Sequence, residues 1–187
     1  MTDPAARQAA GNISLVPAAK RVFGKGASLV MAPFTHASPH NPSRFTDGSY
    51  GVYYAGHAFA TALREVAYHR ARFHASTKDP ATDTTFKTIT AGINKLLHDI
   101  REGDWSALLH PDPASYPTSQ AFGAQLRAAG SNGIVYPSVR HPGGECLAAF
   151  WPNVMTSPIE GKHIRLKWDG SAIVAWFDFE TKQWSAL

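Results

Sequence analysis

Residue types that suit a phosphorylated, ring-bearing ligand lie close together between residues 44 and 65. Arg44 precedes the adjacent pair Tyr53 and Tyr54, and Glu65 follows in the next segment. A guanidinium offers paired donors to phosphate oxygens, and an aromatic face attracts a cationic ring. A fixed carboxylate stabilises positive charge that develops during a reaction. This stretch therefore predicts an anionic ligand that contains a ring.

A short strand and the helix after it are expected to position these groups. Residues 50–55 carry Tyr and Val between glycines, which predicts a buried strand. Successive strand residues point to opposite sides, so only one of Tyr53 and Tyr54 can face a cleft. Residues 58–73 place their apolar side chains on one helical face, with Glu65 on its flank. Glu65 either points into a cleft or pairs with His69 or Arg72 on the same edge of the helix.

The remaining segments predict an α+β fold with more strands than helices. Residues 27–34 are expected to form a strand, and residues 35–44, with two prolines, a loop. Residues 86–100 fit both a helix and a strand. A helix is expected over 119–129, and strands over 133–138 and 146–151. Alternating apolar residues on either side of Asp169-Gly170 predict a terminal β-hairpin.

Composition favours one compact domain, with a mixed, largely antiparallel β core and flanking helices. The chain has 187 residues and a net charge of +4, which favours anionic partners. Residues 1–19 are expected to be a loose lead-in. No leader and no apolar run of about 20 residues is found, so a soluble cytoplasmic protein without membrane contact is expected.

Several kinds of site are not predicted. Cys146 is the only cysteine, so neither an intramolecular disulfide nor a cysteine-rich zinc site is possible. The nine histidines include no H-E-x-x-H pattern, and no metal site is expected. The sequence contains neither a P-loop nor G-x-G-x-x-G. Any dinucleotide bound here would therefore be a substrate and not a hydride carrier on a Rossmann fold.

The order of several short motifs resembles the RES-domain toxins of bacterial toxin–antitoxin modules. The motifs run from about residue 20 to about residue 152, and their order and spacing together carry the resemblance. They are Arg21-Val, Ser43-Arg44-Phe45, Gly51-Val-Tyr-Tyr-Ala, Thr61-Ala-Leu-Arg-Glu65, Gly133-Ile-Val-Tyr-Pro-Ser138-Val-Arg140 and Gly144-Glu-Cys-Leu-Ala-Ala-Phe150.

The resemblance implies an ADP-ribosyltransferase-like catalytic domain over residues 20–187 that consumes NAD+. It implies Arg21, Tyr54, Glu65 and Ser138 as the active-site set. Arg21 is expected to hold the pyrophosphate, with Arg44 as the reserve phosphate contact. Tyr54, or in its place Tyr53, is expected to stack on the nicotinamide, and Ser138 to hold its amide or a ribose hydroxyl.

The resemblance also implies a helix-turn-helix antitoxin partner. The acceptor of the ADP-ribose stays open among water, phosphate and a protein target. Two other functions remain possible on sequence grounds. The basic composition permits a nucleic-acid-binding or RNA-cleaving toxin, although no cationic stripe supports direct nucleic-acid binding. The aromatic residues permit a non-catalytic module that binds a protein partner.

Overall fold

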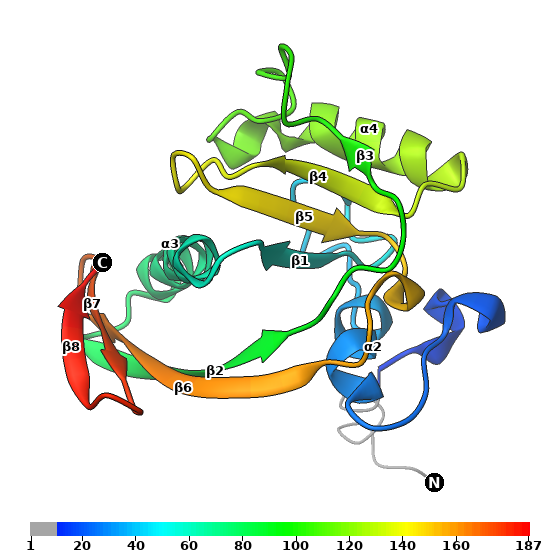
Figure 1. Cartoon of the computed structure of the whole chain (residues 1–187). Coiled ribbons are helices and arrows are strands. Elements are labelled where there is room, and N and C mark those ends of the chain that lie inside the picture. The colour runs from blue at the N-terminus through cyan, green and yellow to red at the C-terminus, as the bar shows by residue number, and fades with distance from the viewer. Residues whose placement is uncertain (1–10) are drawn as a thin grey trace, which may run out of the picture.

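The computed structural model describes residues 11–187, which form two four-stranded sheets (Figure 1). The first sheet has the order β1-β5-β4-β3, and only its β3–β4 pair is parallel. The second sheet, β2-β6-β7-β8, is antiparallel throughout. The strands are β1 (Tyr53–Gly56), β2 (Thr82–Thr90), β3 (His98–Asp99), β4 (Gly133–Pro137), β5 (Glu145–Ala149), β6 (Ile159–Trp168), β7 (Ile173–Asp178) and β8 (Gln183–Ala186).

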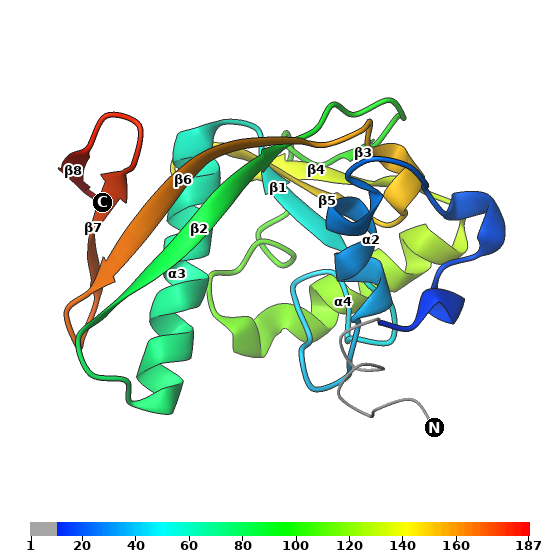
Figure 2. The same ribbon diagram turned by 90° about the horizontal axis from the view of Figure 1, so that it is seen from below.

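Within residues 11–187, three α-helices pack against these sheets, so the predicted α+β class is confirmed. In Figures 1 and 2, α4 covers one face of the first sheet and α3 lies against the second. The α-helices are α2 (Ala27–Thr35), α3 (Phe59–Thr77) and α4 (Tyr116–Ala128). The 3-10 turns are η1 (Ile13–Leu15), η2 (Ala18–Lys20), η3 (Pro113–Ser115) and η4 (Pro152–Val154).

Each sheet has its own hydrophobic core. The larger core surrounds the first sheet and includes the fully buried Phe45, Ile134 and Phe150. The smaller core joins α3 to the second sheet through residues such as Leu63 and Leu166. Burial of large apolar side chains on both sheets is the main force that holds the helices in place.

A buried histidine clamps the end of α3 to the second sheet. The His74 ring, 4% exposed, stacks on Trp168 with ring centroids 5.3 Å apart. Its Nδ1 lies 2.6 Å from Asp79 Oδ2, and its Nε2 lies 3.2 Å from Thr84 Oγ1. Both ring nitrogens therefore have partners, which removes the cost of burying them.

The strand predicted over residues 27–34 is wrong, because this segment forms α2. Its buried residues Val30, Met31 and Phe34 are spaced for one face of a helix and do not alternate. Gly26 begins the helix in the left-handed conformation, with φ of 76°, which glycine adopts at little cost.

The segment over residues 86–100, left open between helix and strand, contains no helix: residues 86–90 belong to β2, residues 98–99 form β3, and residues 91–97 are neither helix nor strand. Residues 82–90 pair with β6 along nearly their whole length. The helical spacing of Ile93, Leu96 and Ile100 does not produce a helix. Backbone bonds in this stretch run instead to distant residues, as from Asn94 N–H to the Val154 carbonyl at 3.1 Å.

The terminal hairpin is confirmed. Gly170 has φ of 103° in the turn between β6 and β7. The Asp169 carboxylate accepts bonds from the N–H groups of Ser171 and Ala172, each at 2.8 Å. Such a short side chain stabilises a tight turn by bonding the backbone just after it.

Part of the predicted lead-in packs against the domain. Residues 1–10 lie outside the described residues, but Val16, only 2% exposed, belongs to the larger core. Within residues 11–187, no helix is both long and apolar enough to span a membrane.

Candidate active site

Glu65 lies on a face of α3 that is turned toward the first sheet. Thr61, Glu65 and His69 follow one another at intervals of four residues, which places them on one side of the helix. The helix starts close to β1 because Gly56 leaves room for it. A Cβ at Gly56 would lie 2.5 Å from the backbone nitrogen of Ala62. The glycine thus allows the tight strand-to-helix junction that positions the carboxylate.

The loop between β4 and β5 holds the Glu65 carboxylate in place. Ser138 donates its hydroxyl hydrogen to Glu65 Oε1 at 2.6 Å. The same hydroxyl accepts bonds from the N–H groups of Arg140 and His141, at 3.2 and 3.0 Å. One turn earlier on α3, Thr61 Oγ1 lies 2.9 Å from His141 Nδ1. The loop is therefore tied to two successive turns of the helix.

Only one oxygen of the Glu65 carboxylate is engaged. The Cys146 thiol donates to Oε1 at 3.6 Å, as Ser138 does, while Oε2 has no hydrogen-bond partner among the described residues. The predicted alternative, pairing with His69 or Arg72, is not observed, since none of the ion pairs within residues 11–187 includes Glu65. Glu65 thus presents an oriented carboxylate oxygen that is free to meet a ligand.

The carboxylate affects the pKa values of neighbouring groups, among them Cys146 and His69. Burial and the nearby negative charge of Glu65 raise the pKa of the Cys146 thiol to about 12, so the sulfur stays protonated and can donate. Desolvation against the surrounding protein lowers the pKa of His69, and Glu65 partly opposes this effect. Both shifts follow from transfer of a charged form out of water.

Glu65 lines a cavity of about 240 Å³ at the end of the first sheet. Its wall combines one carboxylate, two guanidiniums, three tyrosines and small apolar residues. The lining residues are Ser43, Arg44, Tyr54, Ala55, Gly56, Ala62, Glu65, Val66, His69, Tyr116, Tyr136, Val139, Arg140 and Cys146.

Arg44 is the buried cation of this cavity. The residue is 7% exposed, and its Nη1 donates to the carbonyls of Leu108 and His110, at 2.9 and 3.0 Å. Its guanidinium lies 4.8 Å from the centre of the Tyr116 ring. Within the described chain, Nε and Nη2 have no protein partner. The two backbone bonds fix the side chain, so these remaining N–H groups can meet an anion in the cavity.

Arg140 supplies the second guanidinium from the loop after β4. It stacks 3.6 Å from the centre of the Tyr68 ring and donates to the Pro111 carbonyl. Neither Arg44 nor Arg140 forms an ion pair with any acid among residues 11–187. Two cations without a protein counter-charge on one cavity favour an anionic ligand.

Tyr54, and not Tyr53, lies on the same cavity as Glu65. The phenol oxygen of Tyr54 accepts a bond from the Phe45 N–H at 2.9 Å and lies 2.8 Å from Ser43 Oγ. Because the hydroxyl is anchored, the ring of Tyr54, a residue that is 37% exposed, is held at a fixed angle on the wall. Tyr53 packs against the larger core on the other face of β1, as strand alternation requires.

Comparison with known families identifies the kind of domain. A family model of the RES domain matches residues 18–169, which is most of the chain. The chain belongs to the RES-domain family. The match contains every element that contributes to the cavity of this RES domain, from β1 and α3 to β4 and β5. A search of curated proteins gave no match.

Arg21 of this RES domain is not brought to the cavity. Its Nε donates to the Val16 carbonyl at 2.9 Å, and its Nη2 donates to the Ile13 carbonyl at 3.2 Å. These bonds tie the guanidinium to the 3-10 turns before α2, and Arg21 is not among the residues that line the cavity. Arg44 and not Arg21 is the arginine near Glu65, so chain distance from Glu65 was a poor guide to proximity in space.

Ser138 contacts Glu65, as expected for a member of the site, but it does not line the cavity. The hydroxyl lies behind the carboxylate and is used in three hydrogen bonds. The expectation that Ser138 meets a ligand directly therefore has no support in its position. Its place favours a role in orienting Glu65.

Tyr136, Cys146, Tyr116 and Arg140 were not predicted as site residues. Tyr136 and Cys146 are cross-strand partners on one face of the first sheet, and strand alternation in the two predicted strands was a signal that could have found them. Arg140 stands two residues after Ser138 in the same motif. Tyr116 carries no signal in the sequence, because it reaches the site only through the packing of α4 on Arg44.

The described residues show no arrangement suited to a metal ion. Within residues 11–187, no cluster of three or more His, Cys, Asp or Glu side chains is placed to ligate one. The site offers one oriented carboxylate and two fixed guanidiniums, which can act on a ligand electrostatically.

Proposed function

We propose that this RES domain cleaves the bond between nicotinamide and ribose in NAD+. The observation that carries the proposal is the Glu65 carboxylate, held through one oxygen and free at the other, on a cavity with two guanidiniums that lack protein counter-charges. The substrate offers matching groups, namely a pyrophosphate, a cationic aromatic ring and a sugar carbon that becomes cationic.

The reaction requires a negatively charged carboxylate and does not require a proton donor. Loss of nicotinamide from the ribose leaves positive charge on the sugar, in a transition state that resembles the oxocarbenium ion of glycoside hydrolysis. Nicotinamide leaves as a neutral molecule, so it does not have to be protonated. A fixed anion beside the ribose stabilises the transition state more than the ground state, because the sugar charge is present only there. We assign this role to Glu65.

Three other residues orient the substrate and the carboxylate. Arg44, and beside it Arg140, hold the pyrophosphate through N–H groups that the protein does not use. Tyr54 offers its anchored ring to the cationic nicotinamide. Ser138 acts through Glu65, by fixing the direction of the carboxylate, and is a positioning residue.

The cavity is smaller than the substrate. Its volume of about 240 Å³ is below the roughly 300–1,000 Å³ of pockets that enclose drug-sized ligands. We therefore place the nicotinamide riboside half and the adjoining phosphates against Glu65. The adenosine half then lies outside this cavity.

Further parts of the proposal rest on the family resemblance. We propose an ADP-ribosyltransferase-like toxin of a toxin–antitoxin module, neutralised by a helix-turn-helix antitoxin. The same site serves transfer of ADP-ribose to water, phosphate or a protein, because the three reactions differ only in the group that attacks the sugar cation.

The test is the release of nicotinamide from NAD+ by the purified protein. Three reactions are compared: buffer alone, buffer with inorganic phosphate, and a cell extract with NAD+ labelled in the adenosine part. Release in all three with free ADP-ribose as product identifies water as acceptor. Faster release of nicotinamide in the presence of phosphate identifies phosphate as the acceptor. Transfer of the label to protein identifies a protein acceptor. No release under any of the three conditions would refute the proposed reaction.

A further inference from the structure

The terminal strand β8 leaves one edge of the second sheet unpaired. It stands at the end of the strand order and pairs only with β7, and Figure 1 shows it at the outer margin of the molecule. The family match ends at residue 169, so β7 and β8 both lie beyond it. The reaction proposed above uses neither strand, because no residue after 169 lines the cavity at Glu65.

The register of the sheet shows which backbone groups of β7 point toward β8. The Phe179 N–H donates to the carbonyl of His163 on β6 at 3.3 Å. Bonded pairs alternate along an antiparallel ladder, so Phe177, two residues earlier, also bonds to β6. The backbone groups of Trp176 and Asp178 therefore point to the opposite side of β7, where β8 lies.

The same alternation leaves two residues of β8 with free backbone groups. The partners of Trp176 and Asp178 across the register are Ser185 and Gln183, whose bonds hold β8 to β7. The N–H and C=O groups of the intervening residue and of Ala186 point away from β7. On that side the described residues offer no strand partner.

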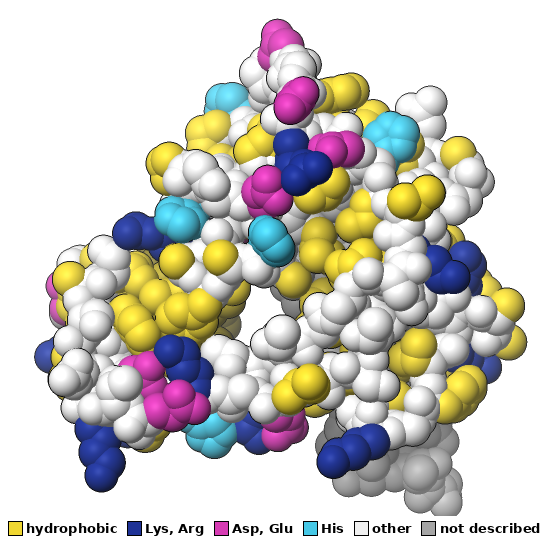
Figure 3. Space-filling model, in the orientation of Figure 1, with side chains coloured by type: hydrophobic (Ala, Val, Ile, Leu, Met, Phe, Trp, Pro, Cys, Tyr) yellow, Lys and Arg dark blue, Asp and Glu magenta, His cyan; other side chains and the backbone are white. Residues whose placement is uncertain are grey.

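This edge lacks the features that usually prevent strands of different molecules from pairing. Residues 183–187 contain no charged side chain and no proline, and the register of β8 with β7 has no bulge. At the other end of the same sheet, β2 carries Asp83 and Lys87. In Figure 3 the surface over β8, at the left margin, is mostly uncharged. The β8 end of the sheet is therefore open to a further strand.

An antiparallel copy of β8 matches the hydrogen-bonding groups of this edge. When a twofold axis passes through Ser185, Trp184 of each copy lies opposite Ala186 of the other. These are the two residues with free backbone groups, and an opposed pair of this kind exchanges both of its N–H···O bonds. The two symmetric pairs use all the free groups of Trp184 and Ala186.

The side chains at this edge are complementary to those of a second copy. Trp184 is 45% exposed, and its ring lies 5.3 Å from that of Phe177, its cross-strand neighbour. Across the twofold axis this large ring meets the small side chain of Ala186, in both pairs alike. Ser185 meets only its own copy. Like charges are not brought together, and each bulky residue faces a small one.

We propose that this protein forms a twofold-symmetric dimer in which β8 of one copy pairs with β8 of another. The two four-stranded sheets join into one continuous sheet. Because both copies use the same surface, the contact closes after two molecules and does not propagate. The dimer leaves the cavity at Glu65 uncovered by residues 183–187. It does not depend on the proposed reaction, so its test uses no activity measurement.

The first test measures molar mass by sedimentation equilibrium over a dilution series, for wild type, Ala186→Pro and Ala186→Ser. Proline removes the N–H that points to the free edge and removes no bond to β7. It should raise the dissociation constant of the dimer at least about 10-fold, because two symmetric hydrogen bonds are lost. Serine keeps the N–H and a small side chain, and should leave the constant unchanged.

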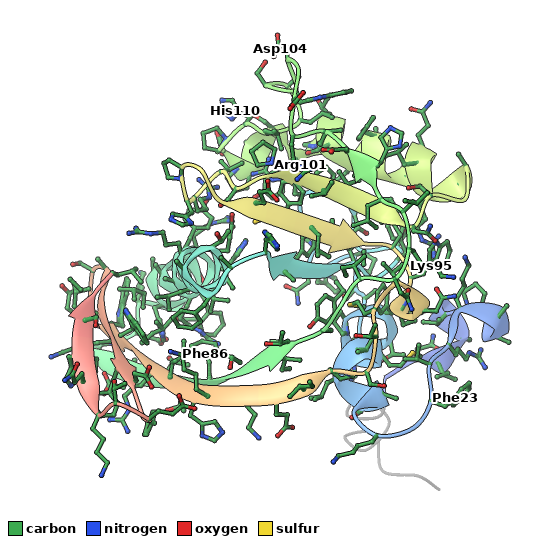
Figure 4. All side chains as sticks on the ribbon, viewed as in Figure 1. Phe23, Phe86, Lys95, Arg101, Asp104 and His110 are labelled. Atoms are coloured by element: carbon green, nitrogen blue, oxygen red, sulfur yellow. The ribbon has the colours of Figure 1, made fainter. Side chains whose placement is uncertain are left out.

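Phe23→Ser is the control for non-specific association through exposed aromatic residues. Phe23 is 82% exposed and lies on the side of the molecule opposite to β8 (Figure 4). The dissociation constant of this variant should equal that of wild type. Circular dichroism during thermal unfolding establishes that each variant is folded.

The register is tested by two single-cysteine substitutions, which also serve if Ala186→Pro does not fold. Ser185→Cys places two thiols opposite each other at the axis, within reach of a disulfide. Gln183→Cys places them roughly 13 Å apart along the strands, which is too far. The native Cys146 is buried and should not compete. Mild oxidation should cross-link Ser185→Cys into a covalent dimer and leave Gln183→Cys uncross-linked.

Four outcomes would overturn the proposal. They are a monomer at every concentration, a dimer that folded Ala186→Pro does not weaken, a dimer that Phe23→Ser abolishes, and equal cross-linking of Ser185→Cys and Gln183→Cys. Species larger than a dimer would equally contradict a contact that closes after two copies.

Discussion

At the scale of single residues, the site depends on which polar atoms the protein leaves free. One oxygen of Glu65 accepts hydrogen bonds from Ser138 and Cys146. One nitrogen of Arg44 donates to two backbone carbonyls. In both residues the bonded atom fixes the side chain and the other atoms remain available. Such fixed groups act on a transition state without having to reorganise.

The two candidate arginines give a first prediction. Arg44→Gln should raise KM for NAD+ by about 10- to 100-fold, because a charge-assisted bond to phosphate contributes about 1.5–3 kcal/mol. Arg21→Gln should leave KM unchanged, because its guanidinium is used on the carbonyls of Val16 and Ile13. Steady-state kinetics of both variants checks this. A large rise in KM for Arg21→Gln alone would show that the phosphate contact was reassigned wrongly.

The single cysteine gives a second prediction. Burial and the Glu65 carboxylate raise the pKa of Cys146 to about 12, and the thiolate is the form that reacts. Cys146 should therefore resist a maleimide reagent at neutral pH in the folded protein and react fully in urea. Mass spectrometry after timed exposure measures the labelled fraction. Rapid labelling of the folded protein would contradict both the burial and the pKa shift.

At the scale of elements, the position of Arg44 depends on close packing of α4. The helix approaches the preceding segment at Gly123, where a Cβ would lie 2.4 Å from the Phe45 carbonyl oxygen and 3.0 Å from its Cβ. Phe45 is fully buried and follows Arg44 directly. The glycine thus allows the helix to support the segment that carries the arginine.

Gly123→Ala should destabilise the protein by about 1–3 kcal/mol, because overpacking forces the backbone to shift. Helix propensity alone predicts the opposite, an increase of about 1 kcal/mol in the free energy of unfolding. Urea unfolding measures the difference, with Gln125→Ala on the exposed side of α4 as control, expected within about 0.5 kcal/mol of wild type. An increase in stability for Gly123→Ala would show that the helix does not pack this closely.

The elements that the sequence predicted best are those whose local signals agree. The hairpin at Asp169-Gly170 and the helix around Glu65 have turn chemistry and periodicity that point the same way. The segment that forms α2 was missed because a short apolar run fits both periods. The sequence named Glu65, Tyr54 and Ser138 together, and the fold brings these three side chains close to one another. It placed Arg21 before Arg44 as the phosphate contact, because the sequence cannot show that Arg44 folds onto the segment before α4.

At the scale of the whole molecule, the two sheets are joined partly through α3, whose start carries the candidate site and whose end is clamped by His74. The hydrogen bond from His74 lowers the pKa of Asp79, with a further contribution from Thr77. A carboxyl group whose pKa is lowered by folding contributes stability above its unfolded value of about 3.9, and this contribution is lost as the pH falls through the folded value.

Asp79→Asn should therefore lower the free energy of unfolding near neutral pH, while at a pH below the folded pKa of Asp79 the variant and the wild type should be equally stable. Urea titrations at the two pH values give the comparison. Asp83→Asn serves as control, because Asp83 is an exposed acid on β2 with only a long contact, 3.6 Å, to Arg165. If Asp79→Asn lowers the free energy of unfolding by the same amount at the acidic pH, the contact between His74 and Asp79 does not stabilise the protein through the charge of Asp79.

The most direct test of the account compares the rate of nicotinamide release from NAD+ by wild type and Glu65→Gln under saturating substrate. Glu102→Gln, at an exposed acid that does not line the cavity at Glu65, is the control. Loss of one preorganised electrostatic group should lower kcat by about 100- to 1,000-fold, with the control unchanged and the variant as stable as wild type. Release at the wild-type rate by Glu65→Gln would contradict the assignment of the carboxylate to the ribosyl cation.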